Sequence, residues 1–311
     1  MTHQASFDVL ALGDLFQDLV MSGFQDWPRP GEEAFATSFH KEIGGGAAIT
    51  ACGLAKLGLR VGVAGVVGSA DGRWMLDQLN AHGVSTAAIR TTAAEPTAFA
   101  VSISTAVDRT FLTYNGANRE LPGLVEQLMA TDVPAQARHI HLAHAMNLAR
   151  VQASFESITA KGSTLSVDVG WHPEWYADPR AIAALKLADV FFPNEREAEL
   201  MTQETEPRRM LEAFQRMGLK RIALKLGKAG GALLWDGEMR FQKPGEIDAV
   251  DTTGAGDCFN AGFLYARLTG MDPKSCLKVG TACGEMSARA LGGVAGFPSK
   301  EELENILCTV K

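Results

Sequence analysis

The stretch DTTGAGD, residues 251–257, combines residue types that can bind an anion and accept a proton. Gly254 and Gly256 let the backbone turn tightly with no side chain in the way, so successive N–H groups can converge on a negative charge. An apolar helical pattern follows and places Asp257 in a first helical turn, where the helix dipole favours a carboxylate. This arrangement suits phosphoryl transfer to a hydroxyl whose proton Asp257 accepts.

The same stretch also has a purely structural interpretation. Glycine-rich turns and aspartates that cap helices are both common, so the glycines could simply make a tight connection and Asp257 could cap the helix. Taken alone, the stretch favours this interpretation slightly. The sequence has no GxxxxGK[ST] loop, no GxGxxG after its first strand-like run and no protein-kinase motif. A P-loop enzyme, a Rossmann dehydrogenase and a protein kinase are therefore disfavoured.

The composition indicates a globular protein with reduced cysteines. The 311 residues are 46% hydrophobic, which is enough for a large core. The formal net charge is −7 and the 29 Lys and Arg residues are scattered, so we expect no nucleic-acid partner. The acidic start and the lack of an apolar stretch of 18 residues predict a cytoplasmic protein that does not cross a membrane. The five cysteines form no CxxC pair or Cys/His cluster, which leaves oxygen atoms as the expected metal ligands.

Strand-like and helix-like segments alternate along most of the chain. Short apolar runs predict buried parallel strands at residues 7–12, 61–67, 139–143, 164–169, 189–192 and 221–226. Helical spacing is found at residues 47–58, 73–83, 180–188, 196–203, 208–218 and 258–270. The alternation predicts an α/β fold in which helices cover both faces of a doubly wound, mostly parallel sheet.

Two segments break this alternation. Residues 21–42 and 97–114 show a period of two, with β-branched and aromatic residues and no helix between the runs. Such a pattern is typical of antiparallel strands with one exposed face. We expect these segments to form a small β-strand lid on a single domain that spans residues 1–311.

Several motifs resemble those of one enzyme family. DTTGAGDCFNAGF (residues 251–263) looks like the C-terminal signature of the ribokinase-like sugar kinases of the PfkB family, and EIGGGAAITACGLAKLG (residues 42–58) is similar to the N-terminal Gly-Gly signature of that family. LGDLFQD, RTFLTYNGAN, PNEREAEL and LKLGKAGGAL match further family segments in the same order. The resemblance covers nearly the whole chain and implies a ribokinase-like fold with a β lid.

The resemblance assigns roles at the phosphoryl-transfer end of the site. It implies that Asp257 is the general base and that Gly254, Ala255 and Gly256 donate the N–H groups of the anion hole. ATP is the implied donor, with nucleotide contacts expected from residues on two loops and one helix, namely Asn194, Lys225, Gly227, Gly230, Gly280, Cys283 and Gly284.

The resemblance also implies metal ions. Asn194 and Glu197 match an Asn-x-x-Glu motif that helps to hold Mg²⁺ through water, although the same spacing is typical of a capping box at a helix start. Asp168 follows a predicted strand and either supports the Mg²⁺ waters or begins a turn. Asp251 and Thr253 align with positions that hold a monovalent cation, here K⁺, in many family members.

At the acceptor end the family pattern is incomplete. Asp18 matches the acid that grips two sugar hydroxyls, and Gly45 would allow close approach of the substrate. Phe16, Gly46 and Ile49 stand where ribokinases have polar residues, so ribose is a disfavoured acceptor. Replacement contacts could come from residues for which a loop or capping role is an equal or stronger alternative, namely Arg109, His144 and Asn147.

These features predict an ATP-dependent sugar kinase with a hexose or a sugar acid as the favoured acceptor. One alternative is a nucleoside kinase of the same family, with the base of the nucleoside against Phe16. Another is a sugar- or nucleotide-binding sensor that needs no base, because a fold does not fix function. The family analogy also predicts a homodimer formed through the lid.

Overall fold

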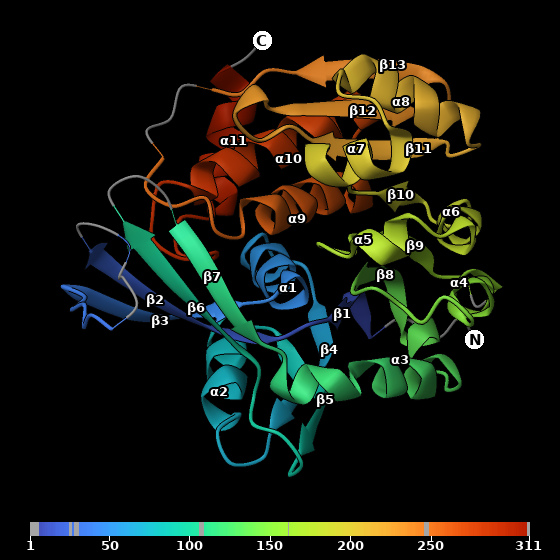
Figure 1. The fold of residues 1–311 in the computed structure, drawn as a ribbon. Helices are drawn as coiled ribbons and strands as arrows, with labels where there is room; N and C mark the ends of the chain where they lie inside the picture. Colours follow the sequence, from blue (N-terminus) through green and yellow to red (C-terminus); the bar gives the residue numbers. More distant parts are fainter. Residues whose placement is uncertain are drawn as a thin grey trace.

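A nine-stranded sheet forms the centre of the part of the chain that this computed structural model describes, which is residues 6–24, 27, 31–105, 109–160, 162–245 and 249–309 (Figure 1). The strand order is β13-β12-β11-β10-β9-β8-β1-β4-β5. The strands from β5 to β11 are parallel, and β12 and β13 add an antiparallel edge. Their bounds are β1 (Phe7–Gly13), β4 (Val61–Gly68), β5 (Ser85–Thr92), β8 (Ala137–Ala143), β9 (Thr164–Val167), β10 (Val190–Phe191), β11 (Arg221–Lys225), β12 (Gly231–Trp235) and β13 (Glu238–Gln242).

Helices cover both faces of this sheet, which confirms the predicted fold class. One face packs against α1 (Gly46–Lys56), α2 (Arg73–Ala81), α9 (Ala255–Leu268), α10 (Pro273–Ser287) and α11 (Lys300–Thr309). The other face packs against α3 (Leu121–Met129), α4 (Val151–Ala160), α5 (Pro173–Tyr176), α6 (Pro179–Leu185), α7 (Glu195–Thr202) and α8 (Pro207–Arg216). None of the helices in the described ranges combines the length and the apolar composition that a membrane crossing requires.

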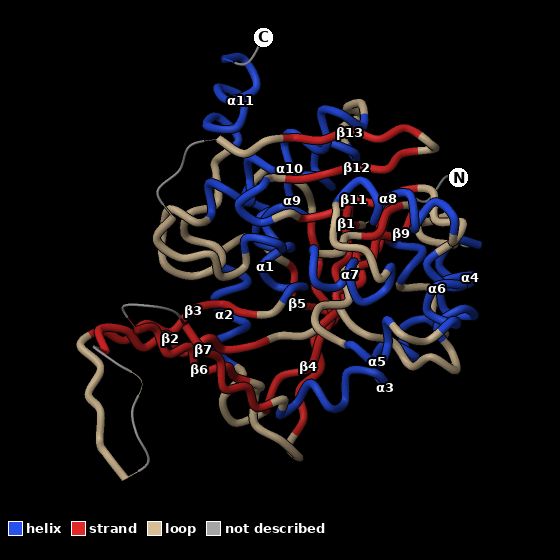
Figure 2. The backbone as a smooth tube through the Cα atoms, turned by 45° about the horizontal axis from the view of Figure 1, so that its top comes forward, coloured by secondary structure: helices blue, strands red, loops and turns tan. Residues whose placement is uncertain are grey.

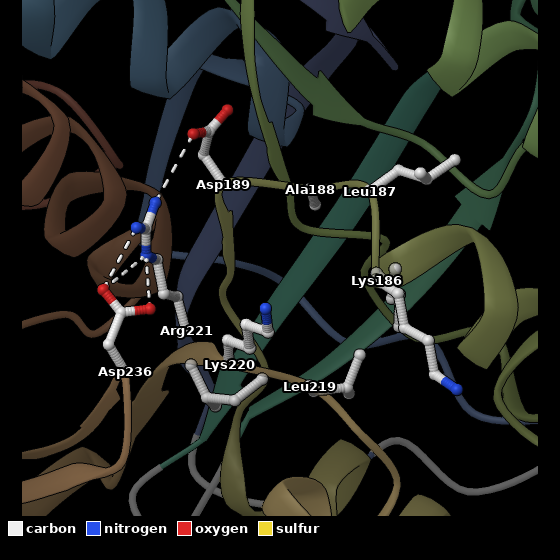
Figure 3. Close-up of a pocket in the computed structure, with 10 residues that line it drawn as sticks. Lys186, Leu187, Ala188, Asp189, Leu219, Lys220, Arg221 and Asp236 are labelled. Atoms are coloured by element: carbon white, nitrogen blue, oxygen red, sulfur yellow. Dashed lines mark hydrogen bonds and ion pairs between the residues drawn. The ribbon is translucent and has the colours of Figure 1, made fainter.

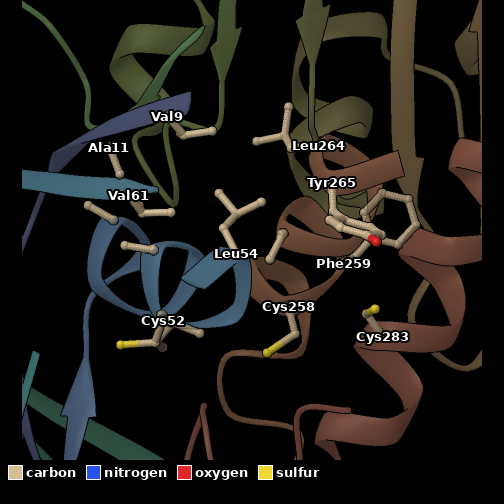
Figure 4. Close-up of a cluster of buried hydrophobic side chains, with 14 of the residues drawn as sticks. Val9, Ala11, Cys52, Leu54, Val61, Cys258, Phe259, Leu264, Tyr265 and Cys283 are labelled. Carbon is tan, nitrogen blue, oxygen red and sulfur yellow. The ribbon is translucent and has the colours of Figure 1, made fainter. Parts of the chain in front are cut away.

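The continuous apolar runs reflect burial of the central strands on both faces. In β1, Val9 and Ala11 point to the α1 and α9 side, whereas Leu10 and Leu12 point to the α3 and α4 side. Figure 4 shows the first of these clusters, in which α1 and α9 pack beside one another under the sheet. This packing places the N-termini of both helices at the carboxyl ends of the central strands.

A second, four-stranded sheet projects beside the main sheet (Figures 1 and 2). It contains β2 (Phe16–Phe24), β3 (Ser38–Gly44), β6 (Phe99–Thr105) and β7 (Arg109–Tyr114) in the order β3-β2-β6-β7. The expectation of purely antiparallel strands was wrong for one pair: β2 and β6 run parallel, because the chain passes through the main sheet between them and returns in the same direction.

The lid sheet includes residues that the period-two pattern did not reveal. β2 begins at Phe16 rather than near Met21, and its first residues pair with the end of β3. Gln17 and Asp18 interrupt the apolar alternation there, and the Gln17 amide donates a hydrogen bond to the Asp71 carbonyl oxygen at 3.3 Å. Asp18 therefore belongs to the lid, whereas Asp257 belongs to the main domain.

Candidate active site

The carboxyl ends of the central strands meet the N-termini of α1 and α9. Gly45 is the N-cap residue of α1 with a φ of 95°, and Gly46 is the first residue of this helix. The Thr50 hydroxyl of α1 donates a hydrogen bond to the Asp257 carbonyl oxygen of α9 at 3.2 Å. A side-chain carbon on Gly46 would lie 3.0 Å from Asp257 Oδ1. The start of α1 therefore lies directly against the expected general base.

The expected anion hole lies at the first turn of α9. Gly254 is its N-cap residue and has a left-handed φ of 68°. The Ala255 N–H donates to the Thr252 carbonyl oxygen at 3.2 Å and is thus engaged in a turn. The first N–H groups of a helix have no acceptor within the helix. Gly256 and Asp257 therefore contribute donors more readily than Ala255 does.

The environment of Asp257 raises its pKa to near neutrality. Burial and the negative charge of Asp168 raise the pKa of Asp257 to about 7, against an opposing effect of Lys225. Asp18 and Glu197 add smaller contributions in the same direction. A base with a pKa near the working pH is well matched to general-base catalysis.

Asp18 lies on the face of the lid sheet that is turned to this edge of the main domain. Its side chain is buried, and a carbon on Gly44 would lie 2.1 Å from its Oδ1 atom. Burial, with the charges of Asp251 and Glu42, raises its pKa to about 7. The oxygens of a buried carboxyl group are stabilised by hydrogen bonds from hydroxyl groups, such as those of a sugar acceptor.

Asp251 organises the loop in front of α9. Its Oδ1 atom accepts hydrogen bonds from the N–H and the hydroxyl of Thr253 at 2.9 and 2.7 Å, and its Oδ2 atom accepts one from the Gly292 N–H at 2.9 Å. The two residues expected to hold a monovalent cation are thus already joined to one another. The carboxylate ties the anion-hole loop to the segment after α10.

Asp168 forms an ion pair with Lys225, which the sequence did not indicate. The Lys225 Nζ atom lies 2.5 Å from Asp168 Oδ2, and Asn260 Nδ2 donates to the same oxygen at 2.6 Å. Burial by itself would raise the pKa of Asp168, but the Lys225 ammonium and the Asn260 amide hold that pKa below its ordinary value. The carboxylate expected to support Mg²⁺ waters is therefore engaged by a cation from the protein.

Asn194 and Glu197 form a complete capping box at the start of α7. The Asn194 Oδ1 atom accepts from the Glu197 N–H at 2.9 Å, and the Glu197 Oε2 atom accepts from the Asn194 N–H at 2.8 Å. Glu197 is only 2% exposed, and burial together with Asp168 raises its pKa to about 7. No group of three or more His, Cys, Asp or Glu side chains among the described residues could hold a metal ion. Any Mg²⁺ contact from this pair would pass through water, as suits an ion that keeps its hydration shell.

His144 lies beside two residues that the sequence did not single out. Its Nδ1 atom is 3.3 Å from Asp14 Oδ2, and its Nε2 atom is buried without a hydrogen-bond partner. The His172 ring lies 6.4 Å from the His144 ring, and burial lowers the pKa of His172. Asn147 is exposed, and its side chain accepts from the Ala149 N–H at 3.0 Å, which favours the capping alternative for this residue.

The remaining expected acceptor contacts have mixed placements. Phe16 is half-buried at the start of β2, on the same face of the lid as Asp18. Ile49 is buried in α1 against the backbone of Gly254 and Gly293, so it supports the anion-hole loop from below. Arg109 begins β7, but its side chain lies outside the described residues.

The expected nucleotide residues fall into two groups. Gly227 and Gly230 lie in the turn between β11 and β12, next to Lys225. In contrast, the three expected residues of α10 pack on α9. A side-chain carbon on Gly280 or on Gly284 would lie about 3 Å from a carbonyl oxygen of α9. The Cys283 thiol is fully buried beside Gly262 of α9. These three residues therefore pack α10 against α9, and their contact with the nucleotide stays a prediction.

A cavity of about 240 Å³ lies at the amino ends of the strands, opposite to the candidate site (Figure 3). Arg221 pairs there with Asp236 at 3.1 Å and with Asp189 at 3.6 Å, while Lys186 and Lys220 lie on its wall. It is formed where β10 and β11 begin, whereas the carboxyl ends of these strands carry Lys225 and the start of α7. The cavity is thus separate from the candidate site.

Three site residues were missed by the sequence analysis, namely Asp14, His172 and Asn260. Asp14 directly follows the first strand, so its place at the carboxyl end of a strand was a usable signal. Asn260 follows Asp257 by three residues in a helix and therefore shares its face. For His172 the sequence offered no signal beyond its position after β9.

The fold and the site together define a phosphotransferase that acts on an alcohol group. The chain matches the family model described as "pfkB family carbohydrate kinase" over residues 7–300, and it belongs to that family. It is 28% identical over 294 residues to a 2-dehydro-3-deoxygluconokinase of Bacillus subtilis (strain 168), covering 87% of this chain and 88% of that protein. It is 27% identical over 304 residues to a nucleoside kinase of Methanothermobacter thermautotrophicus, covering 95% and 94%. A crystal structure of a putative ribokinase II from E. coli with ATP and Mg²⁺ superposes with a TM-score of 0.80 at 24% identity, covering 97% and 99%.

Proposed function

We propose that the protein is an ATP-dependent kinase that transfers the γ-phosphoryl group to a hydroxyl of a small carbohydrate, with a hexose or a sugar acid favoured over ribose. The observation that carries this proposal is the position of Asp257 at the start of α9, against the start of α1 and with a pKa raised to about 7. Asp257 takes the hydroxyl proton, and the N–H groups that follow Gly254 hold the transferred phosphoryl group. A sensor would need no such base.

The ions have defined places in this proposal. Asn194 and Glu197 would hold the Mg²⁺ of Mg·ATP through water, and the ion would offset phosphate charge. K⁺ is proposed next to Asp251 and Thr253, where it would act on the anion-hole loop. In the chain itself Asp251 already fixes this loop through Thr253 and Gly292, so K⁺ would adjust a loop that is largely formed.

The decisive assay measures ADP formation with Mg·ATP over a panel of hexoses, sugar acids, ribose and nucleosides, each with K⁺ and with Na⁺. We expect turnover above the ATPase background with at least one hexose or sugar acid, and little with ribose. Preferred turnover of a nucleoside would favour the alternative acceptor class, for which Phe16 offers an apolar contact on the lid. The absence of turnover with every acceptor would contradict the proposal.

Asp18 is proposed to hold hydroxyls of the acceptor. We expect Asp18→Asn to lower kcat/KM for the acceptor by about 10- to 100-fold, because charge-assisted hydrogen bonds to the sugar are lost. KM for ATP should stay unchanged, since Asp18 lies on the lid rather than in the β11–β12 turn. Steady-state kinetics with each substrate varied in turn would separate the two effects, and an equal change in both KM values would count against this role.

The lid is also proposed to join two copies of the chain. Strand register places one set of apolar side chains on the lid face opposite to Asp18, namely Leu19, Met21, Phe39, Val101, Ile103 and Leu112. Phe39 and Leu112 are 59% and 54% exposed. An apolar face of this kind on a thin sheet is typical of a subunit interface.

We therefore expect the wild-type chain to be a dimer and the double variant Phe39→Glu/Leu112→Glu to be a monomer. Light scattering coupled to size exclusion gives the mass directly. Phe241→Glu is the matched control, because Phe241 is 45% exposed on β13, an edge strand of the main sheet that is not part of the lid sheet. A wild-type monomer, or a double variant that remains dimeric, would contradict the lid interface.

A further inference from the structure

Lys225 lies where the transferred phosphoryl group is expected. It is the last residue of β11, and only 12% of its side chain is exposed. A side-chain carbon on Gly256, in the first turn of α9, would lie 3.5 Å from Lys225 Nζ. The ammonium group therefore lies against the same backbone that forms the anion hole.

The position of this ammonium group is fixed by other elements. Asp168, just after β9, holds it at 2.5 Å, and Asn260 of α9 donates to the same carboxylate oxygen at 2.6 Å. The Lys225 N–H donates to the Pro193 carbonyl oxygen at 2.9 Å, which joins the strand to the start of α7. A lysine side chain is flexible when free, so these contacts remove most of its rotamer freedom before any substrate binds.

The charges around Lys225 indicate what it would do. The carboxyl groups of Asp168, Glu197 and Asp257 surround the Lys225 ammonium group, and Asp168 forms a direct ion pair with it. Without it, three carboxyl groups would face an incoming phosphate. A fixed cation at this point offsets that repulsion and is available to the phosphoryl oxygens in the transition state.

We infer that Lys225 is a catalytic residue that contacts the transferred phosphoryl group, and that Asp168 and Asn260 are positioning residues for its ammonium group. The inference rests on the proposed kinase function. In the step, the acceptor oxygen forms a bond to the γ-phosphorus, and its proton passes to Asp257. The bond from the γ-phosphorus to the β–γ bridging oxygen breaks, and the electron pair leaves with ADP. Lys225 keeps its protons throughout.

A purely structural ion pair is the competing explanation, and a double variant separates the two. Lys225→Met alone leaves the Asp168 carboxylate buried without its partner, whereas Lys225→Met/Asp168→Asn removes both charges. If the pair were only structural, the double variant would recover both the melting temperature and kcat. If Lys225 acts on the phosphoryl group, the double variant recovers the melting temperature while kcat stays low.

The experiment uses the acceptor that gives the highest wild-type turnover in the panel. We expect Lys225→Met and the double variant to lower kcat on the order of 10²-fold, with KM for the acceptor little changed. Lys225→Arg, which keeps the charge, should restore part of kcat. Lys220→Met is the control, since Lys220 lies at the opposite edge of the sheet and should keep wild-type kinetics.

The two proposals fail in different ways in this experiment. A wild-type chain that phosphorylates no acceptor overturns the kinase proposal itself. An active wild-type chain whose folded Lys225→Met/Asp168→Asn variant keeps its kcat overturns only the role of Lys225. Recovery of kcat by the double variant, but not by Lys225→Met, would assign the pair a structural role and would equally overturn the inference.

Discussion

Asp257→Asn will lower kcat by about 10²- to 10⁴-fold, which is the contribution of a positioned general base. The substitution keeps the size of the side chain and its place beside Gly46, but it removes the group that takes the proton. KM for ATP should change little, because the proposed nucleotide contacts Asn194, Gly227 and Gly230 lie on other segments. A variant that retains full activity would show that another group is the base.

The pH dependence of kcat/KM provides a second test of Asp257 as the general base. Because burial and Asp168 raise the pKa of Asp257 to about 7, the base is protonated below neutrality. Wild-type kcat/KM should therefore rise as the pH increases through about 7 and then level off. Asp257→Asn should lack this rise in its residual activity. A pH profile of the variant that still rises near 7 would assign the rise to a different group, such as Asp18, whose pKa burial also raises to about 7.

Thermal unfolding checks that the variant is folded. A carboxyl group with a raised folded-state pKa contributes stability that is fully present below the unfolded-state value of 3.8 and is lost as the pH rises through about 7. The Asp257→Asn side chain has no proton to lose in this pH range, so the variant does not lose this stability. Relative to the wild type, the variant should therefore gain melting temperature between pH 5 and pH 8, which links low activity to lost chemistry rather than to unfolding.

Gly254→Ala will lower kcat on the order of 10³-fold, as expected for disruption of preorganised N–H donors. The left-handed φ of 68° disfavours a side chain, and the added carbon would lie 2.8 Å from Gly293 Cα and 2.8 Å from the Ile49 Cδ1 atom. The backbone must shift to relieve these contacts, and the N–H groups shift with it. Kinetics with a fixed acceptor would measure the loss.

Gly270→Ala is the matched control at the other end of α9. Gly270 has a similarly positive φ of 88°, but a carbon added there would meet no atom within 4 Å. The two variants thus share the backbone strain and differ in the contacts. An equal loss of kcat in both would mean that helix destabilisation, and not the anion hole, explains the result for Gly254→Ala.

The sequence predicted most strands of the main sheet because each of them is a continuous apolar run that can be recognised without its neighbours. Runs such as residues 61–67 are apolar on both faces, and the structure contains a strand at each of the six predicted positions. The antiparallel edge was missed: β13 is mostly exposed and polar, so it lacks the apolar run that marked the other strands, whereas β12 is buried and apolar but was not recognised as a strand of its own after β11. β5 was missed for a similar reason, since its residues are only partly buried at the other edge of the sheet.

The site was predictable where one motif contains it and unpredictable where distant segments meet. Asp257 and Gly254 lie within seven residues of Asp251 in the sequence, so their proximity could be predicted. The Asp168–Lys225 pair joins residues 57 positions apart, and nothing in either segment indicates the other. For the α10 glycines the structure adds a packing role against α9, which the sequence motifs did not indicate.

The hydrogen bond from Gly292 to Asp251 has a consequence for biosynthesis. Asp18, the proposed acceptor contact, is synthesised long before Asp257, the proposed base, whose loop is tied to Gly292. The bond between Thr50 and Asp257 spans 207 positions. A nascent chain therefore carries the strands of both sheets before it carries the proposed base, and the proposed reaction has to wait for synthesis of the segment up to Gly292.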